Sequence, residues 1–201
     1  MRAPRYSLAL LLLTTACLRG PTPSVRPGPE RRAPTPSEER FPAPPPTLSD
    51  LEYLRSRKLM VPVAGIAPAK IPDTFTAKRG TRIHEAVDLM APRGTRVIAA
   101  DDGRIARLGR NDLGGIVIYA VDSAERFVYY YAHLDRYAEG LAEGMAIAKG
   151  DLLGYVGTTG NAPANAPHLH FQLMKLVDQR MWWSGPPLDP RPLFTTPGTP
   201  R

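Results

Sequence analysis

Short apolar runs separated by turn residues dominate residues 47–196. A helix is predicted only at the start, where Ser49 is a suitable N-cap and Leu51 and Leu54 lie three apart. The later runs are interrupted by Gly, Asp or Ser, which predicts strands joined by tight turns. The predicted strands lie within residues 95–109 (broken at 102–103), 115–134 (turning near 122–123), 145–157 (around 150–151) and 168–177. This spacing predicts an all-β fold, mainly an antiparallel sandwich or barrel, with a short N-terminal helix.

The last of these runs, "PHLHFQLM", places two of the four histidines on one strand. Pro167 suits the first residue of a strand, and side chains then alternate between the two faces. His168 and His170 therefore share a face with Gln172, while the opposite face is apolar. Two imidazoles on one face, with Cα atoms about 6–7 Å apart, are typical of a metal or catalytic site, although a single histidine there is more often structural.

A second predicted strand, "FVYYYAHL", ends at the third histidine. Strict alternation along residues 127–134 places Tyr131 and His133 on the same face. We therefore expect the hydroxyl of Tyr131 near His133, with a core position for this tyrosine as the alternative.

The fourth histidine belongs to the pattern H-x-x-x-D, formed by His84 and Asp88. In a flat strand their Cα atoms would be about 13 Å apart, too far for one ion to bind both. They can bind one zinc ion together only if the backbone bends between them, because neighbouring ligand atoms at zinc are a little over 3 Å apart.

The N-terminal segment has the layout of a secretory signal, with Arg2 and Arg5 before an apolar run from Leu8 to Leu13. Cys17 is the only cysteine, and its position resembles the lipobox of bacterial lipoprotein signals. We expect a signal peptide over residues 1–16 and lipidation of Cys17, with an ordinary cleaved signal as the alternative. A single cysteine allows no internal disulfide, so the exported domain depends on its core or on a metal.

Residues 18–46 contain ten prolines in 29 positions, which favours extended polyproline II and precludes a packed core. We therefore expect a tether over residues 17–47, a folded domain over residues 48–196 and a short tail over residues 197–201. The net charge of +7 divides into +4 for residues 1–46 and +3 for the remainder. The folded part has no basic block, which argues against nucleic-acid binding, and the sequence defines no oligomeric state.

The order of H-x-x-x-D, "YAHL" and "PHLHF" closely resembles the lysostaphin-type (LytM-like) zinc endopeptidases that cut bacterial cell-wall peptides. Flanking segments such as "APRGTRVIAADDGRI", "EGMAIAKGDLLGYVGTTGNA" and "PLDPRPLF" follow in the order of that family. The resemblance covers residues 61–194 and implies a β fold of the duplicated hybrid motif type.

The resemblance implies that His84, Asp88 and His170 hold one Zn²⁺ per chain, and that His133 and His168 line the reaction centre as catalytic residues. Two imidazoles and one carboxylate suit zinc, and three protein ligands leave a fourth position for water. Hydrolysis of a peptide bond by water is then the expected reaction, with one histidine as base and the other stabilising the oxyanion or protonating the amine.

This chain departs from the family pattern at several positions, including Ala86 where glycine is usual. A positive φ at that position would strain alanine. Alternatives to a peptidase are a ligand-free family member that binds the wall and activates an amidase, a cupin-like barrel and a lipoyl-type carrier. All five site positions are intact, which favours the enzyme.

Trp182 and Trp183 follow the strand of His168 and His170. They are expected either to cap the edge of the core or to form a wall of the substrate groove. The resemblance implies peptidoglycan peptide as the partner, with the D-alanyl–diaminopimelate cross-link or a glycyl-glycine bridge as the bond. A lipid anchor and proline-rich tether imply membrane attachment, at the outer membrane facing the periplasm.

Overall fold

The computed structural model describes residues 48–195. These residues lie within one compact unit, Pro46–Arg201. The expected signal peptide, lipidated Cys17, tether and C-terminal tail lie outside the described residues. Within the described part of the chain, no helix is long and apolar enough to span a bilayer.

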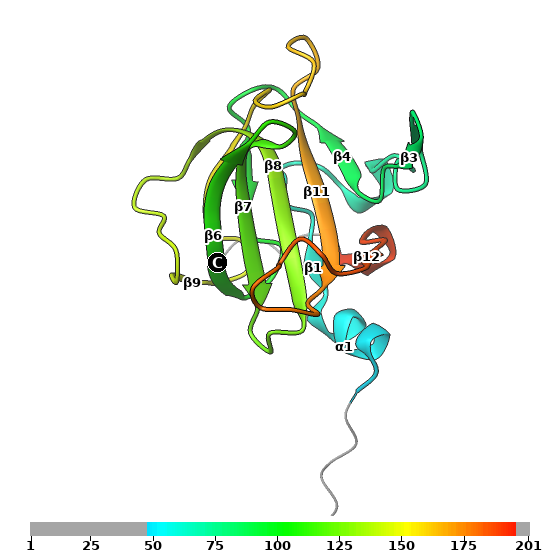
Figure 1. The fold of residues 1–201 in the computed structure, drawn as a ribbon. Coiled ribbons are helices and arrows are strands. Elements are labelled where there is room, and N and C mark those ends of the chain that lie inside the picture. The colour runs from blue at the N-terminus through cyan, green and yellow to red at the C-terminus, as the bar shows by residue number, and fades with distance from the viewer. Residues whose placement is uncertain (1–47, 196–201) are drawn as a thin grey trace, which may run out of the picture. The chain divides into compact units, whose positions relative to one another are not determined.

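The α-helix α1 (Asp50–Arg57) precedes the strands (Figure 1). Ser49 and Glu52 form a capping box, in which each side chain bonds the backbone N–H of the other residue. Tyr53 donates to Asp122 at 2.5 Å, and Arg57 forms an ion pair with the buried Asp101. The helix is thus attached to the sheet by buried polar contacts as well as by Leu54.

Among residues 48–195, the strands form one large antiparallel sheet and two small pairs. The large sheet has the order β12-β11-β8-β7-β6-β9, while β10 joins β5 to β8 and β4 pairs with β11. β1 pairs with β13 in parallel, and β2 and β3 form a hairpin. The strand bounds are β1 Leu59–Met60, β2 Lys78–Arg79, β3 Arg82–Ile83, β4 Val87–Met90, β5 Arg96–Ile98, β6 Gly103–Asn111, β7 Gly115–Asp122, β8 Phe127–Tyr137, β9 Ala146–Ile147, β10 Leu152–Val156, β11 His168–Lys175, β12 Pro187–Leu188 and β13 Phe194–Thr195. Two short 3-10 helices span Pro68–Lys70 and Arg191–Leu193.

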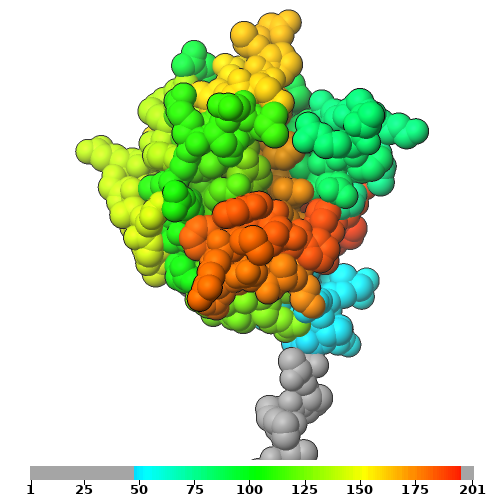
Figure 2. Space-filling model, viewed as in Figure 1, coloured from blue at the N-terminus to red at the C-terminus, as the bar shows by residue number. Residues whose placement is uncertain are grey.

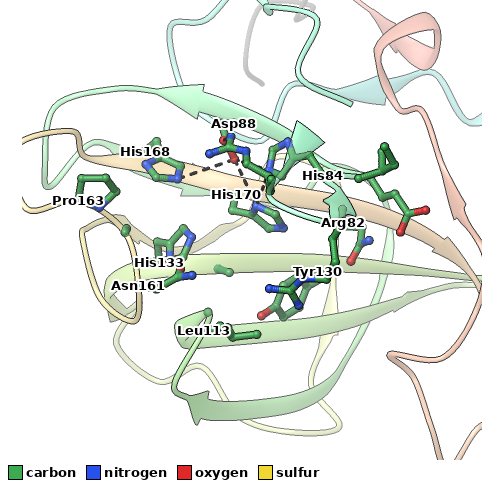
Figure 3. Close-up of a pocket in the computed structure, with 17 residues that line it drawn as sticks. Arg82, His84, Asp88, Leu113, Tyr130, His133, Asn161, Pro163, His168 and His170 are labelled. Atoms are coloured by element: carbon green, nitrogen blue, oxygen red, sulfur yellow. Dashed lines mark hydrogen bonds and ion pairs between the residues drawn. The ribbon is translucent and has the colours of Figure 1, made fainter. Parts of the chain in front are cut away.

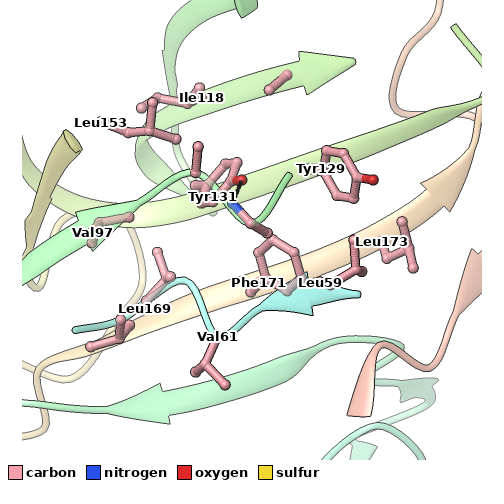
Figure 4. Packing of buried hydrophobic residues seen from close by; sticks show 14 of the residues in the cluster. Leu59, Val61, Val97, Ile118, Tyr129, Tyr131, Leu153, Leu169, Phe171 and Leu173 are labelled. Carbon is pink, nitrogen blue, oxygen red and sulfur yellow. Dashed lines mark hydrogen bonds between the residues drawn. The ribbon is translucent and has the colours of Figure 1, made fainter. Parts of the chain in front are cut away.

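The apolar core lies on one face of β8 and β11 (Figure 4). Tyr129, Phe171 and Leu173 pack there with Leu59 of β1 and Val97 of β5, all of them buried. The opposite face of the same strands carries Tyr130, Gln172 and the histidines, so a solid core lies under the polar face.

The predicted antiparallel, mainly β fold with a short N-terminal helix is confirmed. The helix and the strands β5, β7, β9, β10 and β11 lie within the predicted ranges, because turn residues mark their ends. β6 continues to Asn111 and β8 to Tyr137, two and three residues beyond the ranges predicted for them. The β1–β13 pair and the β2–β3 hairpin were not predicted, because each strand is only two residues long and has no periodicity to recognise.

Candidate metal centre

His84, Asp88 and His170 converge on one point (Figure 3). His84 Nε2 lies 3.1 Å from Asp88 Oδ1 and 3.1 Å from His170 Nδ1, and His170 Nδ1 lies 3.2 Å from the same carboxylate oxygen. The three atoms form a nearly equilateral triangle. Zinc with bonds of about 2.0–2.1 Å separates tetrahedral ligand atoms by about 3.3 Å, so this donor set fits the ion in both chemistry and spacing.

A bend at Glu85 brings the first two of these side chains together. Glu85 has φ +56°, in the left-handed region, and its N–H donates to the carbonyl of Phe75. Asp88 then enters β4, where it pairs directly across from His170 of β11. The bend required of H-x-x-x-D is present, and it falls at Glu85. Ala86 has no positive φ and is fully buried, so alanine is not strained there.

Backbone carbonyls fix the orientation of three of the four imidazoles. The Nδ1–H groups of His84, His133 and His168 point at the carbonyls of Thr74, Thr159 and Ala166, at 2.9, 2.8 and 2.9 Å. Donation to these carbonyls places the proton on Nδ1 and leaves each Nε2 as an acceptor directed into the site. His170 differs, because its Nδ1 faces Asp88 and His84.

A β-bulge in β8 brings His133 into the site. Tyr131 pairs with Ile118 and Leu134 with Ile116, so β8 has an extra residue between these two pairs. His133 occupies that position with φ +61°, and its N–H donates to the carbonyl of Gly114 at 2.7 Å. The bulge breaks the alternation of faces. As a result the ring of His133 lies 4.9 Å from that of His168.

The same bulge puts Tyr131 and His133 on different faces, so the expectation that the Tyr131 hydroxyl lies near His133 is wrong. Tyr131 lies on the core face, is 0% exposed, and its oxygen accepts the N–H of Ala100 at 3.0 Å. Tyr131 is therefore a structural residue and cannot contact a substrate. The tyrosine that lines the site is Tyr130, with its ring 6.0 Å from that of His170. Sequence reasoning missed Tyr130 because it assumed unbroken alternation up to His133.

Asp88 is ionised in this arrangement. Burial alone would raise its pKa, but hydrogen bonds and charge interactions with His170 and His84 outweigh burial and hold the pKa well below its usual range. Its second oxygen, Oδ2, accepts Arg79 Nη2 at 2.5 Å. The carboxylate therefore presents one oxygen to the histidines and one to arginine. Arg79 was not predicted, because it lies in a hairpin that the sequence did not reveal.

His133 is neutral at ordinary pH. Burial is the largest effect and lowers its pKa to about 4, against the raising effect of the Thr159 carbonyl. Its Nε2 is then available to accept a proton.

The four histidines and Asp88 line a pocket of about 490 Å³. Arg79, Arg82 and Glu85 also line it, as do Leu113, Asn161 and Pro163. Figure 2 shows the hollow between the teal and green segments, with orange residues between them. A second hollow of about 580 Å³ shares Arg82, Leu113, Tyr130 and Gln172 with the first and extends to Tyr119, Met174 and Trp183.

The two tryptophans have different surroundings. Trp183 is 59% exposed and lines the second hollow, where substrate contact stays a prediction. Trp182 is half-buried against an apolar cluster formed by Ala106, Val121, Val128 and Met174, and it lines neither hollow. Of the two positions expected for Trp182, the structure therefore gives the core edge and not the groove, because Trp182 packs against this apolar cluster.

Comparison with known families matches residues 82–190 to peptidase family M23. The chain is 34% identical over 118 residues to an L-Ala–D-Glu endopeptidase of Bacillus subtilis, covering 56% of this chain and 35% of that protein. It is 29% identical over 93 residues to the peptidoglycan DD-endopeptidase ShyC of Vibrio cholerae, covering 46% of this chain and 20% of that protein. The chain thus spans about a third or less of the length of these relatives.

A similar fold occurs in Csd3 of Helicobacter pylori. The two structures align with a TM-score of 0.53 and 28% identity, over 69% of this chain and 35% of that one. The family match spans more than half of the chain and contains His84, Asp88, His133, His168 and His170. On this evidence, the chain belongs to peptidase family M23.

Proposed function

We propose that this protein is a zinc-dependent endopeptidase that hydrolyses peptide cross-links of bacterial peptidoglycan. One observation carries the proposal: three ligand atoms form a triangle with edges of 3.1–3.2 Å, and two further imidazoles stand beside it in the same pocket. Peptidase family membership supports the reaction class, and the names of both curated relatives support a wall peptide as the substrate.

His84, Asp88 and His170 would hold the ion. When bound there, Zn²⁺ supplies Lewis acidity, which makes water more acidic and a scissile carbonyl more electrophilic. Arg79 keeps Asp88 Oδ2 engaged, so Oδ1 is the oxygen directed at the site. The core beneath β8 and β11 keeps the strands rigid, which preserves this geometry.

His133 and His168 would move the protons. Both rings direct Nδ1 at a backbone carbonyl, and their centres are 4.9 Å apart, so both can reach one peptide group through Nε2. One accepts the proton of the attacking water, and the other stabilises the oxyanion or protonates the departing amine. Peptide hydrolysis needs both events, which accounts for two histidines outside the ligand set.

We propose the D-alanyl–diaminopimelate cross-link as the bond. The DD-endopeptidase name of one relative supports this bond, whereas the other is named for the L-Ala–D-Glu bond. We also propose export with a lipid anchor on Cys17 and attachment to the outer membrane facing the periplasm. The apolar run before Cys17 and the proline-rich segment after it support this location.

Digestion of purified muropeptides, followed by mass spectrometry of the fragments, tests the proposal. We expect cross-linked dimers to be converted to monomers, the reaction to stop with a chelator, and added zinc to restore it. Wall binding with no new fragments at any zinc concentration would instead identify a non-catalytic wall-binding regulator.

A further inference from the structure

Two arginines of the β2–β3 hairpin border the metal pocket, and they differ in their contacts. Arg79 is engaged with Asp88 Oδ2. Arg82 is exposed and forms no ion pair with any residue among positions 48–195. The hairpin therefore supplies one cation that supports the site and one that is available to a ligand.

Arg82 lies where the two hollows meet. Four residues line both of them, namely Arg82, Leu113, Tyr130 and Gln172, and Arg82 is the only charged residue of the four. It lines the same pocket as His84 and Tyr130 (Figure 3). A group bound to Arg82 would thus lie beside the reaction centre.

The other charges near Arg82 are Glu85 in the first hollow, Asp112 in the second, and the paired Arg79 and Asp88. Glu85 and Asp112 are exposed, and neither forms an ion pair with Arg82. The guanidinium consequently keeps its donors for an incoming acceptor. A planar guanidinium matches a carboxylate through two parallel hydrogen bonds.

The proposed substrate carries a carboxylate next to the scissile bond, where a group bound to Arg82 would lie. In a D-alanyl–diaminopimelate cross-link, the carbon bonded to the scissile amide nitrogen also bears a free carboxylate. A bond inside a continuous peptide, such as a glycyl-glycine bridge, has a neutral amide at that place. A cation beside the reaction centre can therefore distinguish the two kinds of bond.

We propose that Arg82 binds the free carboxylate adjacent to the scissile amide nitrogen and thereby selects cross-links to diaminopimelate. This inference rests on the proposed endopeptidase function and adds a specificity-determining residue to it. The contact is charge-assisted and partly exposed to solvent, so its loss should cost about 10-fold to 100-fold in kcat/KM.

The test is a cycle of two substrates and two proteins. The substrates are a cross-linked muropeptide dimer with this carboxylate free and the same dimer with it converted to the primary amide. The proteins are the wild type and Arg82→Gln, with Arg55→Gln on α1 as a control for the same change of net charge. Zinc content is measured for each protein to confirm an intact site.

We expect the wild type and Arg55→Gln to cleave the dimer with the free carboxylate about 10-fold to 100-fold faster than the amidated dimer. Arg82→Gln should cleave both dimers at the slower rate, with unchanged zinc content. An equal rate on both substrates for the wild type would overturn the role of Arg82 while leaving the endopeptidase proposal intact. If Arg82→Gln kept the preference for the free-carboxylate dimer, the role of Arg82 would likewise be overturned and the endopeptidase proposal would stand. Failure of the zinc-loaded wild type to cleave either dimer would overturn the proposed bond itself.

Discussion

His84 Nε2 lies 3.1 Å from His170 Nδ1, although 86 positions separate the two residues in the sequence. His84 donates its Nδ1–H to the carbonyl of Thr74, so in the neutral ring Nε2 carries only a lone pair. The carboxylate oxygen of Asp88 is equally close to both nitrogens. Three electron-rich atoms at this separation are stable only around a proton or a cation, which is the physical reason for placing an ion at their centre.

Removal of a ligand should release the ion. We expect His84→Ala, Asp88→Ala and His170→Ala each to lower zinc affinity by at least 100-fold, because two remaining ligands cannot complete a tetrahedral site. Competition with a coloured chelator measures the affinity. Asp112→Asn is the matched control, since Asp112 lies in the second hollow only. Unchanged zinc affinity in His170→Ala would contradict the assignment.

Removal of His133 or His168 should lower activity without releasing the ion. We expect His133→Asn and His168→Gln each to lower kcat by about 100-fold to 10,000-fold, the usual range for a general acid or base, while zinc stays bound. Asparagine is chosen at position 133 because it tolerates the left-handed conformation of that residue. Full activity in either variant would remove that histidine from the mechanism.

The adjacent tyrosines should differ in their effects. Tyr131→Phe removes the acceptor for the buried N–H of Ala100, so we expect a loss of about 1–3 kcal/mol in the free energy of unfolding with little change in KM. Tyr130 lines the pocket, so Tyr130→Phe should change KM more than stability. Urea unfolding and steady-state kinetics on the same preparations separate the two roles. A large kinetic defect in Tyr131→Phe at unchanged stability would contradict the core assignment.

The stability of the metal-free protein should depend on pH through His133. Its pKa falls from its ordinary value of 6.5 to about 4 on folding, because burial disfavours the charged form. The unfolded chain then binds more protons between these values, so the contribution is fully present above about pH 6.5 and is lost as the pH falls toward 4.

Urea unfolding at pH 7 and pH 5 in the presence of a chelator measures this contribution. We expect the wild type to lose about 2 kcal/mol more than His133→Asn over this range. Other groups titrate in both proteins, so the comparison isolates His133. Equal losses in the two proteins would show that this imidazole is not buried in its neutral form.

Local patterns predicted the strands that have turn residues at their ends. The pair His168 and His170 was placed correctly on one face, because β11 alternates without interruption. The same rule wrongly placed His133 on the face of Tyr131, since the bulge at His133 depends on the loop carbonyl of Gly114 and on Thr159 from a distant segment. A single-strand pattern contains no information about such contacts.

The bend at H-x-x-x-D shows a similar limit. Spacing alone required that the backbone turn between His84 and Asp88, but it did not identify the residue that turns. Glu85 takes the left-handed conformation because its N–H bonds the carbonyl of Phe75, a contact made only in the folded chain. Arg79 and Arg82 depend on the same hairpin and were found only in the structure.

The claim that His84, Asp88 and His170 bind one zinc ion is tested most directly by X-ray diffraction from crystals of the zinc-loaded protein. Data are collected on both sides of the zinc absorption edge. We predict a single anomalous peak at about 2.0–2.2 Å from His84 Nε2, Asp88 Oδ1 and His170 Nδ1, with His133 and His168 outside bonding distance. An anomalous peak at any other position, or no peak between these three side chains, would contradict their assignment as the zinc ligands.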